Sequence, residues 1–139
     1  MQRWRERGFT PWAEGAAVVA ITIALNRAMR MDGALGVAVV DYVSRMTLGT
    51  LGAPDGLDLS KAASAGTDLV RAKLSAMELI GYAPTRLEDI LITLDTEYHL
   101  IRPLIRRRHE GLFVYVVLDR GKADLPSVRK ELEMIERLL

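Results

Sequence analysis

The amino-acid sequence predicts a single α+β domain, in which helices cover the faces of a mainly antiparallel sheet. Three observations support this prediction. The chain has 139 residues, which is the size of one ordinary domain. Segments with helical periodicity alternate with short apolar runs rich in Val, Ile and Leu. Neighbouring apolar runs are joined by turns of only a few residues, and such short connections join antiparallel strands.

The composition excludes several classes of function. Hydrophobic residues make up 50% of the chain and charged residues 27%, which argues against a wholly disordered protein. The 19 basic and 18 acidic residues give a net charge of +1, so we expect no nucleic-acid binding of the kind that a basic surface drives. The absence of Cys excludes thiol catalysis, thiolate metal sites and disulfides, and it fits a reducing compartment.

The N-terminal region has some features of a secretory signal, because three arginines precede the apolar run 16–25. However, Glu14 interrupts the approach to the run, Asn26 and Arg27 follow it, and no small-residue cleavage pattern is present. The run is also shorter than the roughly 18 apolar residues that a membrane span requires. We therefore expect a helix of the folded domain, no membrane span and a cytoplasmic protein.

The first helix is predicted from about Trp12 to Arg30, so residues 1–11 form a flexible N-terminal arm and residues 12–139 the domain. At about 100° per residue, one side of this helix is expected to face the core. That side carries Val18, Ile21, Leu25, Ala28 and Met29. Val19 and Ile23 fall on the opposite side, which suggests a second contact there.

Two strands should follow the first helix. The Val-rich run Leu35–Asp41 is typical of a strand that is buried on both faces. The segment Tyr42–Arg45 is predicted as a turn. The strand Met46–Gly52 is weaker because it contains glycines, and we expect it at an edge of the sheet.

The second helix is predicted to begin after Asp58, a plausible N-cap, and to end near Ile80, just before Gly81. It carries two adjacent apolar stripes, one of Leu59, Ala63, Gly66, Val70, Leu74 and Met77, and one of Ala62, Leu69, Ala76 and Ile80. Together they span about 160° of the helix, which is more than one buried face needs. Gly66 costs about 1 kcal/mol relative to Ala, which suggests that another backbone approaches closely. A single sheet is therefore not expected to cover this helix.

Three strands and a helix complete the chain. Strands are predicted over Leu87–Asp95 and Tyr98–Arg108, with a bulge or an unpaired position at Pro103. The most apolar strand, Leu112–Asp119, should be central. The last helix should begin after Asp124 as its N-cap.

No catalytic, metal or cofactor motif is present. The chain lacks the G-x-x-x-x-G-K-[ST] and G-x-G-x-x-G patterns. The spacing of His99 and His109 does not match that of metal ligands. We interpret His99 as a half-buried polar residue and His109 as part of a solvated turn. The match of Ser127–Lys130 to S-x-x-K stands alone and is interpreted as coincidental. We expect no cofactor.

Two charge clusters leave alternatives open. The cluster Arg106–Arg108 at a hairpin tip could bind an anion or an acidic partner, although a solvated turn is the favoured interpretation. The acidic residues Glu88, Asp89, Asp95 and Glu97 flank the third strand. They could form a metal or acid–base pair, but we favour edge charges that discourage unwanted strand pairing.

Several segments resemble the bacterial roadblock (dynein light chain type) family. These are GVAVVDYVSRMTLGTLG, VRAKLSAMELIG, LEDILITLDTEYHLIRPL and GLFVYVVLDRGKADLPSVRKELEMIERLL. The resemblance covers about Ala16 to Leu139, and its most specific parts are ILITL before YHLIRPL and LFVYVVLDR before a capped helix. The chain departs from the family pattern at Arg45, where a turn glycine is common, and at Pro126 and Val128 in the last helix.

The resemblance implies a profilin-like, five-stranded antiparallel sheet in the order α-β-β-α-β-β-β-α. The second helix would lie on one face and the terminal helices on the other. It also implies homodimers that join their third strands and pack their second helices side by side. Members of the family are often encoded with a small Ras-like GTPase, in many cases beside a sensor-kinase-like protein, and act as regulators or scaffolds, not as enzymes.

On this basis we expect a non-catalytic homodimeric adaptor that binds a small Ras-like GTPase and modulates its nucleotide cycle. The expected dimer interface consists of Ala62, Gly66, Leu69, Lys73, Ile90, Leu91, Ile92 and Leu94. The expected partner-binding residues are Lys61, Ser64, Asp68, Arg71, Ser75 and Glu78. The alternative is a small-molecule-sensing or scaffold module without a GTPase partner, which would need a cavity with convergent polar groups.

Overall fold

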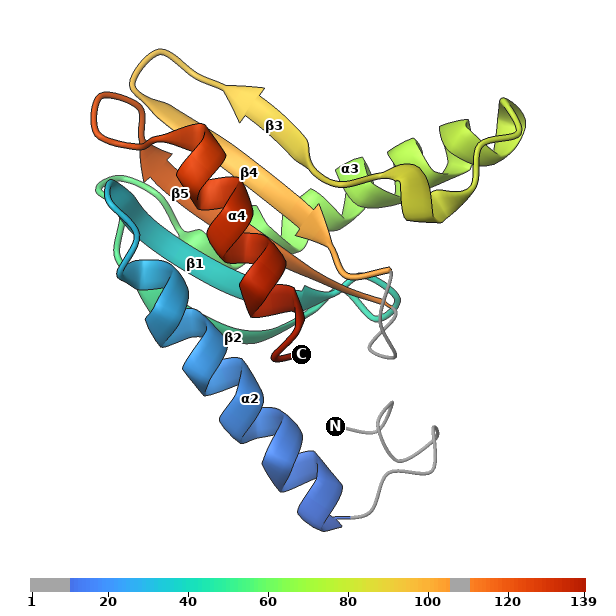
Figure 1. Cartoon of the computed structure of the whole chain (residues 1–139), viewed down its shortest axis with the longest axis horizontal. Helices are drawn as coiled ribbons and strands as arrows, with labels where there is room; N and C mark the ends of the chain where they lie inside the picture. Colours follow the sequence, from blue (N-terminus) through green and yellow to red (C-terminus); the bar gives the residue numbers. More distant parts are fainter. Residues whose placement is uncertain (1–10, 106–110) are drawn as a thin grey trace.

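A computed structural model describes residues 11–105 and 111–139 (Figure 1). The predicted arm and the cluster Arg106–Arg108 therefore lie wholly or almost wholly outside the described residues. The elements are α2 (Pro11–Met29), β1 (Ala34–Asp41), β2 (Met46–Gly52), α3 (Leu59–Leu79), the 3-10 turn η1 (Pro84–Arg86), β3 (Ile90–Thr93), β4 (Glu97–Pro103), β5 (Leu112–Asp119) and α4 (Leu125–Glu136). Their order confirms the α+β prediction.

The five strands form one antiparallel sheet in the order β2-β1-β5-β4-β3. The apolar strand β5 is central and the glycine-containing β2 is at an edge, as predicted. The helix α3 lies on one face of the sheet, and α2 and α4 lie on the other (Figure 1). The result is the three-layered, profilin-like arrangement that the resemblance implied.

The alternation of side chains along the strands divides the core into two layers. Val37 and Val39 of β1 pack with α2 and α4, whereas Ala38 and Val40 pack with α3. The prediction that Val18 faces the core is wrong, because its side chain is 53% exposed. The cause is that α2 turns Ala17, Ala20 and Ile21 toward the core, and this orientation leaves Val18 at the exposed side of the helix.

Both predicted N-caps are confirmed. The Asp58 carboxylate accepts a hydrogen bond from the N–H of Lys61, and the Asp124 carboxylate accepts one from the N–H of Ser127. Gly81 has a φ of 77°, so a glycine suits the end of α3. The C-terminal part of α3 extends beyond the sheet (Figure 1).

The third and fourth strands are shorter than predicted. Residues Pro84–Arg86 form a 3-10 turn and the Asp89 carboxylate bonds to Arg129 of α4, so β3 begins only at Ile90. Pro103 is the last paired position of β4, and the expected bulge is not observed in its register. Leu104 donates its N–H to the carbonyl of Leu112 in β5, so the nitrogen of the preceding Pro103 points to the other side of β4, toward β3. The pairing of β4 with β3 stops at Ile101, so β3 does not lie opposite this nitrogen. The missing N–H therefore leaves no ladder bond unmade.

Candidate functional site

Three sides can be distinguished on α3. Its buried side contains Leu59, Ala63, Gly66, Thr67, Val70 and Met77. We call Ala62, Leu69, Lys73, Ala76 and Ile80 the apolar flank. We call Lys61, Ser64, Asp68, Arg71, Ser75 and Glu78 the polar flank. Helical geometry places the two flanks on opposite sides of the buried side.

The apolar flank exposes large hydrophobic side chains. Leu69 is 46% exposed and Ile80 is 59% exposed. The polar flank contacts the β1–β2 side of the sheet, since Arg71 donates to the carbonyl of Tyr42 and Ser64 donates to the carbonyl of Arg45. Because β2 and β3 are the two edges of the sheet, the apolar flank faces the half that ends in β3.

Strand β3 has an open edge and apolar side chains on both faces. Among the described strands, only β4 pairs with it. Ile90 and Ile92 pack on the α3 side, and Leu91 packs on the opposite side. Leu94 donates its N–H to Glu97, so the even-numbered residues of β3 bond to β4, and the N–H and C=O groups of Leu91 and Thr93 point to the open edge. Such an edge can pair with another strand.

Gly66 is explained by packing within the chain. A Cβ at this position would lie 3.1 Å from Tyr115 Cδ2 and 3.4 Å from Phe113 Cε1. The expectation that another backbone approaches Gly66 is therefore wrong, because the close neighbours are aromatic rings of β5. Gly66 is buried against its own sheet and offers no surface to a second chain.

Three of the six residues expected to bind a partner contact the β1–β2 turn. The Ser64 hydroxyl donates to the carbonyl of Arg45 at 3.1 Å. Asp68 accepts a hydrogen bond from Arg45 at 2.5 Å, which lowers the pKa of Asp68 and raises that of Arg45. Arg71 donates to the carbonyls of Tyr42 at 2.8 Å and Val43 at 2.7 Å.

The other three residues of the polar flank, Lys61, Ser75 and Glu78, have exposed side chains. Sequence reasoning missed the β1–β2 turn as part of this site. A signal was available in Arg45, which stands where the resemblance leads one to expect a glycine. Its φ is 67°, and it is the only non-glycine residue with positive φ among those described.

His99 takes part in a buried chain of hydrogen bonds. Its Nδ1 lies 2.5 Å from the Tyr115 hydroxyl and its Nε2 lies 2.7 Å from Glu97 Oε1. Burial, followed by the charge of Glu97, raises the pKa of Tyr115 to about 12, so the hydroxyl stays protonated and can donate to the ring. His99 is thus a satisfied structural residue, as the sequence indicated, while His109 lies outside the described residues.

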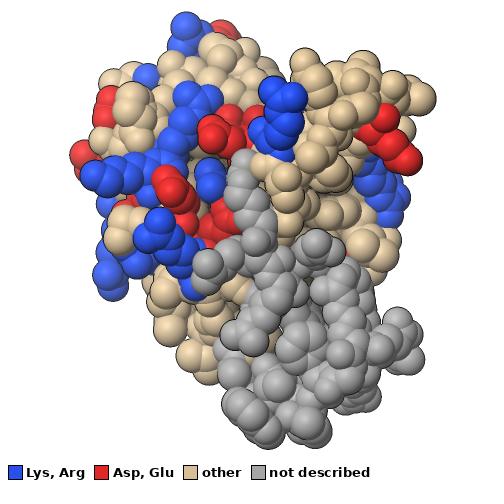
Figure 2. All heavy atoms as spheres, turned by 45° about the vertical axis from the view of Figure 1, so that its right-hand side comes forward, with Lys and Arg blue, Asp and Glu red and all other residues tan. Residues whose placement is uncertain are grey.

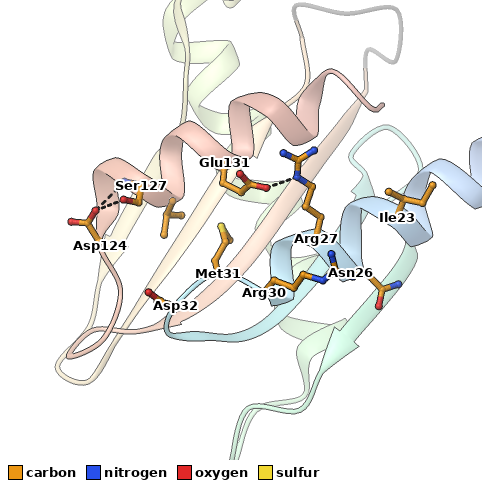
Figure 3. Close-up of a pocket in the computed structure, with 10 residues that line it drawn as sticks. Ile23, Asn26, Arg27, Arg30, Met31, Asp32, Asp124, Ser127 and Glu131 are labelled. Carbon is orange, nitrogen blue, oxygen red and sulfur yellow. Dashed lines mark hydrogen bonds and ion pairs between the residues drawn. The ribbon is translucent and has the colours of Figure 1, made fainter.

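A groove of about 790 Å³ lies between α2 and α4 (Figure 3). Arg27 and Glu131 form an ion pair across it, and Asp124 bonds to Ser127 at its other end. These two pairs of polar groups bond to each other, whereas the side chains of Arg30 and Asp32 also line the groove and bond to no other lining side chain among the described residues. This groove is one place where a small-molecule-sensing function would act.

The charged residues around α4 are largely paired. Arg102 and Glu136 form a buried ion pair at 2.7 Å, and Arg129 bonds to Asp89 at 2.9 Å. Figure 2 shows basic and acidic side chains interleaved over one side of the molecule. In the part of the chain that the structure describes, no group of three or more acidic or His side chains could hold a metal ion.

This sheet, with one long helix on one face and two helices on the other, defines a roadblock-type fold. Among solved structures, it is similar to MglB of Myxococcus xanthus, with a TM-score of 0.73 and 16% identity over 87% of this chain and 85% of that one. It is also similar to the gliding protein MglB of Thermus thermophilus, with a TM-score of 0.72 and 18% identity over 88% and 87% of the two chains.

A Roadblock/LC7 domain from Streptomyces avermitilis gives a TM-score of 0.65 at 13% identity, over 85% of this chain and 89% of that domain. The sequence matches no protein-family model and no curated protein. These similarities confirm the roadblock-type fold expected from the sequence. Within residues 11–105 and 111–139, no helix is long and apolar enough to cross a membrane.

Proposed function

We propose that the chain is a non-catalytic homodimeric regulator that acts in the cytoplasm, binds a small Ras-like GTPase and modulates its nucleotide cycle. One observation carries the proposal: β3 combines an open edge with apolar side chains on both faces, beside the apolar flank of α3. Chains seldom leave such an edge uncovered. The roadblock-type fold supports the GTPase as partner through the family resemblance.

A second copy related by a two-fold axis would cover both features at once. Its β3 would continue the sheet, and its apolar flank would pack against the apolar flank of the first copy. The proposed interface is that expected from the sequence without Gly66, and it consists of Ala62, Leu69, Lys73, Ile90, Leu91, Ile92 and Leu94.

The hydrogen-bonding groups of β3 limit the possible registers of the dimer. With the two-fold axis at Leu91, Leu91 lies opposite its copy and Ile90 lies opposite Ile92 of the second chain. With the axis at Ile92, Asp89 would lie opposite Asp95, and like charges directly opposite each other are destabilising. We therefore favour the axis at Leu91.

A binding assay tests the GTPase part of the proposal. The Ras-like GTPase encoded nearest to this gene would be loaded with GDP or with a non-hydrolysable GTP analogue and titrated with the chain. The proposal expects binding in at least one nucleotide state. An absence of binding in both states would contradict it.

The small-molecule-sensing alternative rests on the groove between α2 and α4. Arg30 and Asp32 line it and are open to a ligand. We place this alternative second because the roadblock-type fold supports the regulator through the family resemblance. Thermal-shift measurements with a panel of metabolites test it, because a ligand that binds the folded chain raises the melting temperature.

A further inference from the structure

The turn between β1 and β2 is fixed in one conformation by side chains on both sides of it. The Asp41 carboxylate accepts hydrogen bonds from the N–H groups of Val43 at 2.9 Å and Ser44 at 3.3 Å. From α3, the Arg71 guanidinium donates to the carbonyls of Tyr42 at 2.8 Å and Val43 at 2.7 Å. The backbone of the turn is thus bonded both to its own strand and to the helix.

Arg45 gives a second sign that the turn is held in place. Its φ of 67° lies in the left-handed region, which costs a non-glycine residue about 1–2 kcal/mol. The conformation is supported by the Ser64 hydroxyl on the Arg45 carbonyl and by the Arg45 guanidinium on Asp68 and on the carbonyl of Ser64. A strained conformation of this kind persists where several contacts with the surrounding structure hold it in place.

The turn and the first residue of β2 expose two large apolar side chains. Val43 is 56% exposed and Met46 is 53% exposed. A rigid element loses little conformational entropy when it binds, and apolar side chains that enter a pocket supply much of the energy of an interface. The turn therefore has the properties of a pre-organised anchor for a protein partner.

The exposed charged side chains beside the turn, among the described residues, carry a small excess of positive charge. Arg45 belongs to the turn, Arg71 bonds to it, and Lys61 follows Ser60, whose carbonyl accepts from Thr47 of β2. The exposed carboxylates are Asp68, which pairs with Arg45, and Asp58, which caps α3 beside Lys61, whereas the Asp41 carboxylate that bonds to the turn is buried. Three exposed positive side chains against two exposed negative ones favour an acidic surface on the partner.

We propose that Val43, Met46, Arg45, Arg71 and Lys61 form a docking surface, the turn surface, for a pocket on the GTPase that is apolar at its centre and lined by carboxylates at its rim. This inference rests on the proposed function and deepens it, because it names the contact surface. The turn surface adjoins the polar flank of α3, on the side away from the apolar flank, so the proposed dimer leaves it accessible.

A pair of matched double variants tests the turn surface. V43S/M46S removes its two apolar anchors. V18S/V19S removes the same kind of side chain from α2, on the other side of the sheet from α3, where Val18 is 53% and Val19 is 58% exposed. Affinity for the nucleotide-loaded GTPase would be measured by calorimetry, with light scattering and circular dichroism to follow the mass and the fold of each variant.

The turn surface predicts that V18S/V19S binds the GTPase like the wild type and that V43S/M46S binds at least about tenfold more weakly with unchanged mass and fold. Lys61→Glu should slow association, with a smaller effect at high salt.

Equal binding by V43S/M46S and the wild type would overturn the turn surface and leave the proposed function intact. A change in mass for V43S/M46S would make the turn a self-association surface and would also overturn it. No binding by the wild type would contradict both proposals.

Discussion

Arg45 and Asp68 form an ion pair at 2.5 Å that joins the β1–β2 turn to α3, 23 residues further along the chain. The pair links a residue in a left-handed conformation to a residue of the polar flank. Both side chains are substantially exposed, so the pair adds little to stability by itself. Its effect is positional, since it helps to hold the turn against the helix.

Substitution of Arg45 should separate the backbone effect from the side-chain effect. Arg45→Gly removes the cost of the left-handed conformation and also removes a weak ion pair, so its stability should remain close to that of the wild type. Arg45→Ala keeps the backbone cost, so it should be about 1 kcal/mol less stable than Arg45→Gly. Urea unfolding of the two variants measures this difference. Equal stability would show that residue 45 does not keep its left-handed conformation.

The ionisation of Asp68 should depend on Arg45. The hydrogen bond from Arg45 lowers the pKa of Asp68 in the folded chain. A carboxylate whose pKa is lowered by folding stabilises the folded chain at pH values above its pKa in the unfolded chain, which is about 4. This stabilisation is lost as the pH falls through the pKa of the carboxylate in the folded chain. Titration by NMR should therefore give Asp68 a lower pKa in the wild type than in Arg45→Gln. The same pKa in both proteins would mean that the ion pair does not persist in solution.

Gly66→Ala should destabilise the fold although Ala is the better helix former. Alanine gains about 1 kcal/mol in helix propensity. Its Cβ would meet Tyr115 Cδ2 at 3.1 Å, and the Tyr115 ring is restrained by its hydrogen bond to His99. Because overpacking costs about 1–3 kcal/mol, we expect a net loss of about 1 kcal/mol in the free energy of unfolding. A gain in stability would mean that the Tyr115 ring can move aside.

The proposed dimer register can be tested by cross-linking, because the chain has no native Cys to interfere. With the axis at Leu91, the Cα atoms of the two copies of Leu91 would lie about 5.5 Å apart, within the range that a disulfide spans. Leu91→Cys should therefore give a covalent dimer on oxidation, whereas Ile92→Cys, at about 7–8 Å from its copy, should not.

The reverse result, with cross-linking at position 92 alone, would place the axis at Ile92. Cross-linking at neither position would mean that β3 is not the interface between copies.

Local patterns predicted most of the fold. Periodicity and cap residues gave the order of the elements, the N-caps Asp58 and Asp124, and the central position of β5. The errors arose where the outcome depended on contacts distant in sequence. Periodicity placed Val18 on the core-facing side of α2 but could not indicate that the helix turns Ala17 and Ala20 to the core instead. Likewise, β3 begins late because Asp89 bonds to Arg129, 40 residues further along the chain.

The candidate site was predictable only in part. The two apolar stripes of α3 and the apolar third strand were visible in the sequence because they follow simple periods. The use of Ser64, Asp68 and Arg71 by the β1–β2 turn was not visible, since it depends on how α3 crosses the sheet. Gly66 was correctly identified as a position of close approach, but the approaching group is the ring of Tyr115.

The central claim is that a β3-paired dimer regulates a GTPase, and single-turnover GTP hydrolysis by the Ras-like GTPase encoded nearest to this gene tests it most directly. The reaction would be followed with no addition, with the wild-type chain, and with Ile92→Asp, which places a charge at the proposed interface. Light scattering would report the mass, which should fall from 2 × 15.4 = 30.8 kDa to 15.4 kDa in the variant. We predict that the wild type changes the hydrolysis rate and that Ile92→Asp does not. The same rate in all three reactions, or an equal effect of a monomeric Ile92→Asp, would contradict the claim.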